Sequence, residues 1–406
     1  MQNLAINPFK PGAGHMPPYL AGRSQEQDRF RTLMKQNVIT ENLVLTGLRG
    51  VGKTVLLETL KPIANNNGWI WTGADMSESA TITEDRLATR LITDISVLTA
   101  SFVTYETQKK SIGFVGAPEV EVNAVDYQTL QRIYQTSPGL VSDKLKAVLL
   151  FVWAALEGQV NGIVFAYDEA QLLADHDKKD QYPLSMLLEI FQSIQKQGVP
   201  FLLVLVGLPT LTTKLVDART YSERMFHVMF LSKLAEEETK EAIVKPMENS
   251  RLTFEEHEVL TIMRLSGGYP YFIQFICREM YDACIANMAK GKPPSVPEEA
   301  IISKLDNDFF SARWDRATDR ERDIMLVISE LNNCDSEFSV SEIVKCSKQT
   351  LAKPFSPSSV SQMFGRLIEK GLIFKNRHGK YSFAVPLLAR FIKRQVAISP
   401  DSFDLF

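Results

Sequence analysis

Short apolar runs alternate with helical patterns along the first half of the chain. The apolar runs are 42–46, 69–73, 162–167 and 201–206. The stretches with apolar residues at helical spacing are 55–64, 83–99, 142–156 and 184–197. Uniformly apolar strands that alternate with helices are typical of a parallel sheet that helices cover on both faces. The pattern therefore predicts an α/β core over residues 1–231.

The pattern changes after residue 231, where helical spacing continues without strands. The helical stretches are 236–247, 254–265, 271–288 and 298–310. They predict a small helical unit at 232–315, followed by a third unit at 316–395 and a short tail at 396–406. Residues 101–136 interrupt the core pattern, and we interpret them as an insertion with a candidate hairpin at 112–122.

Composition adds little to this division. The chain has 406 residues, of which 45% are hydrophobic and 23% charged, as in ordinary globular proteins that bury a core without disulfides. Its four cysteines include no CxxC pair, so a zinc or redox motif is not expected. Residues 1–8 lack the pattern of a signal peptide, and no apolar run approaches the roughly 20 residues that span a bilayer. We therefore expect a cytoplasmic protein with no membrane segment.

A Gly-rich sequence follows the first predicted strand and leads into the first core helix. Residues 47–54 read Gly-Leu-Arg-Gly-Val-Gly-Lys-Thr. Backbone N–H groups in such a loop surround phosphates, Lys53 would reach the β- and γ-phosphates, and Thr54 would offer its hydroxyl to Mg²⁺. The alternative is a Gly-rich turn with an incidental lysine. The residues expected to bind nucleotide here are Gly47, Gly50, Val51, Gly52, Lys53 and Thr54.

Two acids end the apolar run at 162–167. Asp168 and Glu169 would lie at the carboxyl edge of a parallel sheet, the edge at which the Gly-rich loop also begins. Asp168 would hold Mg²⁺, and Glu169 would orient and deprotonate the attacking water. The alternative for this pair is a strand followed by a polar turn.

The loop and the acid pair together resemble the AAA+ and STAND division of P-loop ATPases. The likeness is greatest to the origin-recognition and archaeal-initiator type, which has a parallel-sheet ASCE core, a helical lid and a C-terminal winged helix. Gly22–Glu26 is similar to the G-R-x-x-E motif of that type, Ser222–Phe226 to the segment with an arginine finger, and Gly268–Pro270 to the G-x-P element of STAND ATPases. The resemblance implies a Mg²⁺-dependent ATPase.

The resemblance also implies roles for residues outside the loop. Within an N-terminal arm and motif at 8–30, Arg23 is expected near the adenine, and Tyr269 and Pro270 are expected to touch the base. Arg224 is expected to stabilise charge on the γ-phosphate bound by a neighbouring subunit, which implies a homo-oligomer. The alternatives are a surface ion pair for Arg224, or a finger at Arg219.

Two departures from the family predict slow hydrolysis. Gly207–Thr210 follows a core strand where AAA+ members usually carry an asparagine that senses the γ-phosphate, and Thr210 is the candidate substitute. Gly268–Pro270 stands where initiators often place a sensor arginine. A slow switch is as consistent with these changes as a motor.

The third unit is basic. Residues 338–394 hold 11 Lys and Arg but only two acids, whereas the whole chain has a formal net charge of −3. Ser356 and Pro357 signal the start of a helix at 357–370, which a basic hairpin follows. This order is typical of a winged helix that binds duplex DNA, with Gln362 and Arg366 at base edges or backbone. The candidate phosphate contacts on the hairpin are Lys375, Arg377 and Lys380.

The sequence leaves two functions open. The first is a nucleotide-controlled switch that binds DNA through the basic unit. The second is a STAND-type signalling or defence switch whose winged helix binds a partner protein. A remodelling motor ranks below both because the sequence has no pore-loop or helicase signature.

Overall fold

The computed structural model describes residues 6–12, 14–36, 38–100, 103–107, 120–248, 250, 252–293, 298–377 and 379–398, with backbone alone at 103–107, 120–124 and 377. The chain divides into two compact units. The sheet unit comprises Ser24–Thr46 and Leu56–Phe230, and the helical unit comprises Met1–Arg23, Gly47–Val55 and Leu231–Phe406. The Gly-rich loop thus belongs to the helical unit.

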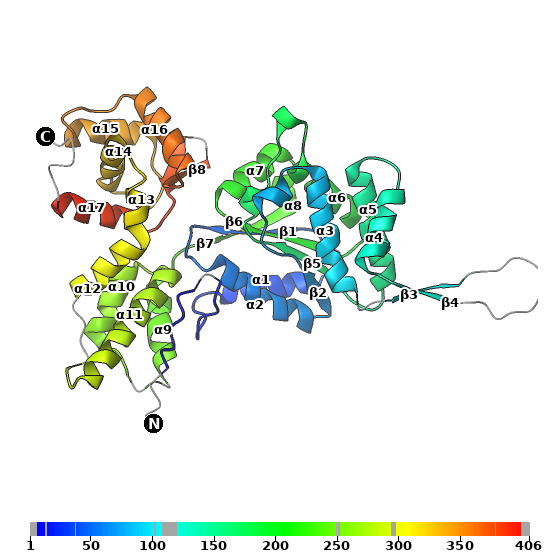
Figure 1. The fold of residues 1–406 in the computed structure, drawn as a ribbon, viewed down its shortest axis with the longest axis horizontal. Coiled ribbons are helices and arrows are strands. Elements are labelled where there is room, and N and C mark those ends of the chain that lie inside the picture. The colour runs from blue at the N-terminus through cyan, green and yellow to red at the C-terminus, as the bar shows by residue number, and fades with distance from the viewer. Residues whose placement is uncertain are drawn as a thin grey trace, which may run out of the picture. The chain divides into compact units, whose positions relative to one another are not determined.

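A five-stranded sheet with the order β2-β5-β6-β1-β7 is the centre of the sheet unit (Figure 1). The neighbours β2 and β5, β5 and β6, and β1 and β6 all pair in parallel. Every residue of β1, β5 and β6 is buried, which explains why these strands are almost wholly apolar; the polar exceptions are Asn42 and Thr46 of β1 and the Tyr167 hydroxyl of β5. This confirms the predicted α/β fold with a parallel sheet. The strand bounds are Asn42–Gly47 (β1), Trp69–Thr72 (β2), Gly162–Tyr167 (β5), Phe201–Gly207 (β6) and Phe226–Leu231 (β7).

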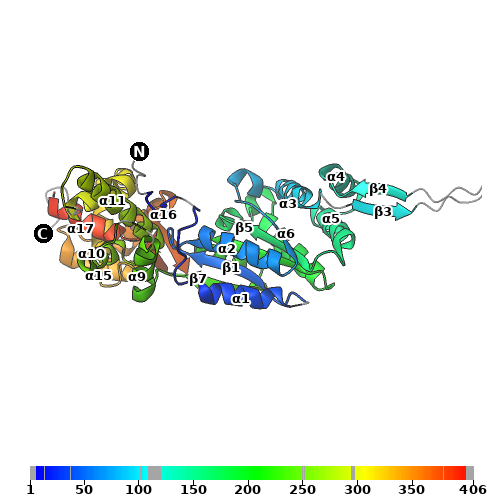
Figure 2. The ribbon, with the colours of Figure 1, turned by 90° about the horizontal axis from the view of Figure 1, so that it is seen from below.

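Helices cover both faces of the sheet. Figures 1 and 2 show α1 and α2 on one face and α3, α5 and α6 on the other. Phe165 of β5 packs edge-on against Phe191 of α6, with ring centroids 5.1 Å apart, and Phe30 of α1 meets Trp71 of β2 at 6.1 Å. The helix bounds are Ser24–Met34 (α1), Lys53–Asn66 (α2), Glu84–Thr99 (α3), Tyr127–Thr136 (α4), Val141–Leu156 (α5), Pro183–Gln195 (α6), Thr210–Ala218 (α7) and Ser222–Met225 (α8).

The stretch interpreted as an insertion contains an antiparallel pair of strands, β3 (Val103–Thr107) and β4 (Val120–Ala124), which precedes α4. The candidate hairpin at 112–122 lies mostly outside the described residues. Its last residues coincide with the start of β4.

The helical unit contains helices at each stretch that the spacing predicts after residue 231. Their bounds are Glu236–Val244 (α9), Lys245–Met247 (η4), Glu256–Ser266 (α10), Pro270–Ala289 (α11), Glu298–Leu305 (α12), Asp306–Ser311 (η5) and Ala312–Trp314 (α13). The N-terminal arm packs on these helices: Phe9 stacks against Phe254 at 6.2 Å, and the Asn7 amide donates to the Asp282 carboxylate at 2.8 Å.

Three helices and a two-stranded antiparallel sheet follow. Their bounds are Asp319–Ser329 (α14), Val340–Thr350 (α15), Pro357–Glu369 (α16), Ile373–Arg377 (β8) and Lys380–Phe383 (β9). Val360, Met363, Phe364 and Leu367 of α16 are buried as the helical spacing predicts. The same helical spacing predicts that Ile368 lies on this apolar stripe, but its side chain is 38% exposed because it lies at the edge of the buried face.

A last helix, α17 (Leu388–Ile398), was not predicted. Phe391 of α17 stacks on Phe310 at 5.3 Å and meets Trp314 edge-on at 5.9 Å. These contacts join α17 to η5 and α13.

We expect Phe391→Ala to lower the free energy of unfolding by about 3–5 kcal/mol, because it removes a ring that is 1% exposed and leaves a cavity beside two aromatic partners. Phe230→Ala is the matched control, since that ring is 62% exposed. Urea unfolding followed by tryptophan fluorescence measures both. Equal stability of the two variants would contradict the packing role of Phe391.

Candidate functional site

The Gly-rich loop has the backbone geometry that only glycine adopts readily. Gly50 and Gly52 have φ values of 79° and 89°, in the left-handed region. A Cβ built on Gly52 would meet no atom within 4 Å, so the loop borders open space there. Helix α2 begins directly after it, at Lys53. Glycine-rich loops at a helix N-terminus are typical of anion-binding sites.

Lys53 folds back over this loop. Its Nζ donates to the carbonyl oxygens of Gly47 at 3.0 Å and Leu48 at 2.9 Å. The ammonium group is therefore held beside the loop, where it can exchange carbonyl oxygens for phosphate oxygens.

Arg23 supports the loop from outside. Its side chain is buried, and Nη2 donates to the carbonyl oxygens of Val51 at 2.9 Å and Ser232 at 2.8 Å. The place near the adenine that the resemblance implies stays a prediction, and in this structure the guanidinium is held on the backbone carbonyls of Val51 and Ser232. These hydrogen bonds stabilise the backbone of the loop, a role for Arg23 that the motif alone did not indicate.

The start of α11 also contacts the loop, through a residue that the sequence analysis missed. The backbone N–H of Tyr271 donates to the carbonyl oxygen of Gly50 at 3.1 Å. Tyr269 is buried, packs edge-on against Phe272, and has its pKa raised by burial to about 12. Pro270 is the first residue of the helix. The signal for Tyr271 was its position directly after the G-x-P element.

The N-terminal arm passes close to the other end of the loop. A Cβ built on Gly14 would lie 3.3 Å from Cγ2 of Thr54. The arm therefore lies close to the first turn of α2 at Thr54.

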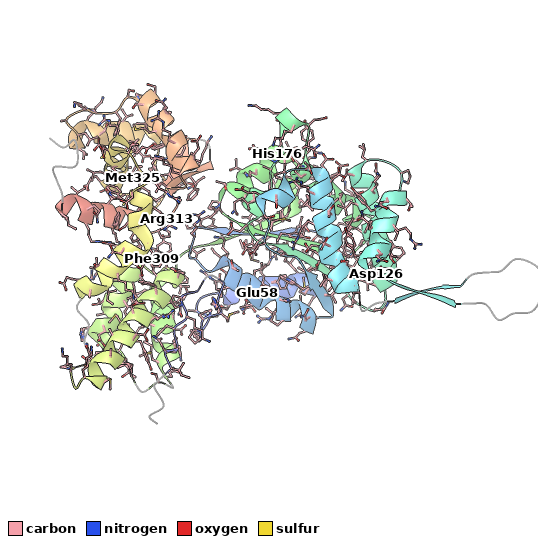
Figure 3. All side chains as sticks on the ribbon, in the orientation of Figure 1. Glu58, Asp126, His176, Phe309, Arg313 and Met325 are labelled. Atoms are coloured by element: carbon pink, nitrogen blue, oxygen red, sulfur yellow. The ribbon has the colours of Figure 1, made fainter. Side chains whose placement is uncertain are left out.

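Three arginines gather near the loop. Burial lowers the pKa of Arg313, and the nearby charges of Arg49 and Arg316 lower it further. Arg313 donates to the carbonyl oxygen of Phe309, whose ring packs against Tyr271 at 5.2 Å (Figure 3). Sequence reasoning missed this cluster because only Arg49 belongs to a motif.

The acid pair lies in the sheet unit. Asp168 is buried directly after β5, and its Oδ1 accepts a hydrogen bond of 2.7 Å from the backbone N–H of Glu169. Glu169 has a left-handed backbone conformation and an exposed side chain, which accepts a hydrogen bond from Nε2 of Gln171. Because β5 and β1 belong to one parallel sheet, their carboxyl ends lie at the same edge.

Arg224 and Arg219 differ in their surroundings. Arg219 lies 3.4 Å from the Glu189 carboxylate. The Arg224 side chain on α8 is exposed, and among the described residues it has no ion pair or side-chain hydrogen bond. Arg224 is therefore the better placed of the two to meet another molecule.

The candidate nucleic-acid residues are placed unequally. Gln362 and Arg366 are exposed on α16, and Lys375 is exposed on β8. Lys380 Nζ lies 3.4 Å from the Glu342 carboxylate, so its charge is partly balanced. The side chain of Arg377 lies outside the described part of the structure.

Other cations of this segment pair with acids outside it. Lys370 lies 2.6 Å from Glu321 and Lys393 lies 3.5 Å from Glu330, while Arg394 pairs with Asp306. The local excess of positive charge is thus smaller than the count of 11 against two suggests.

A groove of about 530 Å³ lies among α15, the start of α16 and the β8-β9 turn. Its walls include two lysines on α15, Lys345 and Lys348, which the sequence analysis did not single out. Their spacing of three residues on a helix was the available signal. The remaining lining residues are Ser339, Val340, Ser341, Val344, Pro357 and Gly379.

The side chains of Thr54 in the helical unit and Asp168 in the sheet unit are each of a type that Mg²⁺ accepts as a ligand. Thr54 and Asp168 offer a hydroxyl and a carboxylate, and Mg²⁺ commonly takes one or two such oxygens and completes its shell with phosphates and water. Among the described residues, no group of three or more His, Cys, Asp or Glu side chains forms a metal site of its own. In the same part of the chain, no helix has the length and apolar character required to cross a bilayer.

Comparison with known proteins supports the fold. The Walker-type ATPase paby2304 of Pyrococcus abyssi is 16% identical over 92% of this chain and 96% of that one, with a TM-score of 0.52. The ORC2 protein of Aeropyrum pernix in its ADP form is 15% identical over 96% of this chain and 100% of that one, with a TM-score of 0.53. At this identity the likeness shows a shared fold, that of the P-loop ATPases.

A family model matches only the C-terminal part of the sequence. The family model described as Domain of unknown function (DUF8462) matches residues 307–392, from η5 to α17. No curated protein matches the chain in sequence.

We expect Arg23→Ala to weaken nucleotide binding roughly tenfold, because it removes a charged donor from two backbone carbonyls and frees the loop to move. Titration with a fluorescent ATP analogue measures the affinity, and circular dichroism verifies folding. Arg31→Ala is the control, since Arg31 is paired with Asp28 on the exposed side of α1. If Arg23→Ala folds and binds nucleotide with unchanged affinity, Arg23 does not stabilise the loop for nucleotide binding.

Proposed function

We propose that this protein is a nucleotide-controlled switch that binds ATP with Mg²⁺, hydrolyses it slowly, and binds duplex DNA through its C-terminal basic unit. The observation that carries the nucleotide part is the loop itself. It combines two left-handed glycines, open space at Gly52, and Lys53 at a helix N-terminus. The shared fold with P-loop ATPases supports the same conclusion.

Each residue of the loop has a distinct part in this proposal. The backbone N–H groups bind the phosphates, and Lys53 offsets the charge that develops on the transferred group. Thr54 and Asp168 would hold Mg²⁺, which supplies positive charge at the β- and γ-phosphates when bound. The cations of Arg49 and Arg313 add to the attraction for a polyanion.

Glu169 is the proposed general base. Its exposed carboxylate follows β5, at the sheet edge where β1 ends and the loop begins. It would accept a proton from the water that attacks the γ-phosphate. Slow turnover follows from Gly207, since the end of β6 carries no side chain to contact the γ-phosphate.

Arg224 supports a homo-oligomer in this proposal. A guanidinium that is exposed and unpaired among the described residues can reach the γ-phosphate of a second copy. Hydrolysis would then require the neighbouring subunit.

The order of α14, α15, α16 and the β8-β9 hairpin supports a winged helix. Arg366 on α16 and Lys375 on β8 are exposed, and the groove among α15, the start of α16 and the β8-β9 turn carries Lys345 and Lys348. This arrangement suits a DNA phosphate backbone, which dominates the affinity of such proteins.

A partner protein is the second candidate for the same unit. Val340, Val344 and Pro357 give the groove an apolar lining, and several surrounding cations are already paired with acids. These features favour a STAND-type switch in which a protein segment occupies the groove. Wild-type protein that shows no salt-dependent DNA binding at low ionic strength would favour this candidate.

We expect Lys53→Ala to abolish nucleotide binding, whereas Glu169→Gln should bind normally and lose hydrolysis by roughly 100-fold or more. The first change removes the cation of the loop and the second removes a proton acceptor. Lys61→Ala on the exposed side of α2 is the control. Equilibrium binding and phosphate release measure the two steps. Persistent hydrolysis by Glu169→Gln would mean that another group is the base.

For DNA, we expect the double change Arg366→Ala and Lys375→Ala to weaken duplex binding and to reduce the slope of log K against log salt by about 1 for each lost phosphate contact. Lys393→Ala should behave as wild type, because Lys393 is paired with Glu330. Fluorescence anisotropy at several salt concentrations makes the measurement. If the double variant has the same slope of log K against log salt as the wild type, Arg366 and Lys375 do not contact DNA phosphates.

A further inference from the structure

The end of β6 is occupied by a side chain from elsewhere in the sheet unit. A Cβ built on Gly207 would lie 2.5 Å from Oε1 and 3.1 Å from the backbone nitrogen of Gln171. Any side chain at position 207 would therefore collide with Gln171. The carboxamide of Gln171 fills the space that a residue at the end of this strand would otherwise use.

Both ends of that carboxamide have partners. Oε1 accepts a hydrogen bond of 3.0 Å from the backbone N–H of Leu208, and Nε2 donates to the carboxylate of Glu169. A backbone N–H can only donate and a carboxylate can only accept, so the orientation of the amide is determined. Gln171 thus bridges the end of β6 to the proposed general base after β5.

The backbone of Gln171 is also held. Lys214 of α7 donates through Nζ to the carbonyl oxygens of Gln171 and Leu173, and burial lowers the pKa of its ammonium group. Gln171 belongs to the short helix η2 (Ala170–Leu172), which packs against both β6 and α7. The carboxamide is therefore presented from a fixed backbone.

Glu169 needs such a partner. Its φ of 52° is uncommon for a residue with a Cβ, and the hydrogen bond from its N–H to Asp168 helps to keep that backbone conformation. Its exposed carboxylate has several rotatable bonds, so without a donor it would sample many positions. A general base acts only when it lies within hydrogen-bonding reach of the proton it takes.

We propose that Gln171 is a positioning residue for hydrolysis, which holds the Glu169 carboxylate toward the attacking water and ties it to the end of β6. The inference rests on the proposed ATPase function and names how its base is oriented. Because Gln171 contacts the base and not the phosphate loop, its loss should affect turnover and leave nucleotide affinity unchanged.

The test compares kcat and nucleotide affinity in four variants. Gln171→Glu keeps the size and the acceptor for Leu208 but sets a second carboxylate against Glu169, so kcat should fall on the order of 100-fold. Gln171→Ala should lose roughly tenfold, and Gly207→Ala should do the same by displacing the amide. Gln197→Glu, at an exposed glutamine after α6, should match wild type.

A conservative variant distinguishes positioning from simple structural damage. Gln171→Asn keeps a carboxamide on the same backbone of η2, on a side chain that is one methylene shorter. It should lose less kcat than Gln171→Ala, with equal affinity for nucleotide in all folded variants. A melting temperature for each variant verifies folding.

The outcomes separate this inference from the function on which it rests. Wild type that hydrolyses ATP while Gln171→Glu keeps its full kcat would overturn the inference alone. Loss of affinity in parallel with kcat would also overturn it. Wild type that binds nucleotide without ever hydrolysing it would overturn the proposed hydrolysis and this inference together.

Discussion

A loop that turns its N–H groups toward an anion leaves its carbonyl oxygens in need of other donors, and the contacts around residues 47–54 meet that need. Lys53 donates to the carbonyls of Gly47 and Leu48, Tyr271 to that of Gly50, and Arg23 to that of Val51. The donors come from the loop, from α11 and from the segment before α1. Their convergence explains why this short loop groups with the helical unit although it follows a strand of the sheet.

Aromatic packing extends from the loop contact to the C-terminal helix. Tyr271 meets Phe309 at 5.2 Å, and the neighbouring Phe310 stacks on Phe391 of α17 at 5.3 Å. The same segment carries Arg313, whose pKa is lowered by burial and further by the nearby charges of Arg49 and Arg316. The residues that contact the loop and those that hold α17 therefore belong to one packed run of aromatic side chains.

The exposed charge of residues 338–394 depends on which cations form ion pairs in the fold as well as on how many the sequence contains. The basic segment can be counted along the sequence, but Glu321, Glu330 and Asp306 come from outside it and balance three of its cations. The exposed cations of the segment include Lys345 and Lys348 on α15, Arg366 on α16 and Lys375 on β8, together with Lys353 and Arg390. A linear count of charge thus overstates the local excess of positive charge.

The sequence by itself determined strands β1, β2, β5 and β6, most helices and the Gly-rich loop, because each depends on local order: apolar runs are buried on both faces, helical spacing makes one face apolar, and glycine readily adopts the left-handed conformations of the loop. It did not predict β7 or the bounds of β3 and β4. Nor did it predict α17, whose Phe391 is buried only through its contacts with Phe310 and Trp314. It also did not predict that Ile368 is exposed. Tertiary structure alone decided that Arg23 braces the loop, that Tyr271 touches it, and that Gln171 takes the place left by Gly207. The physical reason is that these roles arise from hydrogen bonds between segments far apart in the chain, for which no local pattern exists.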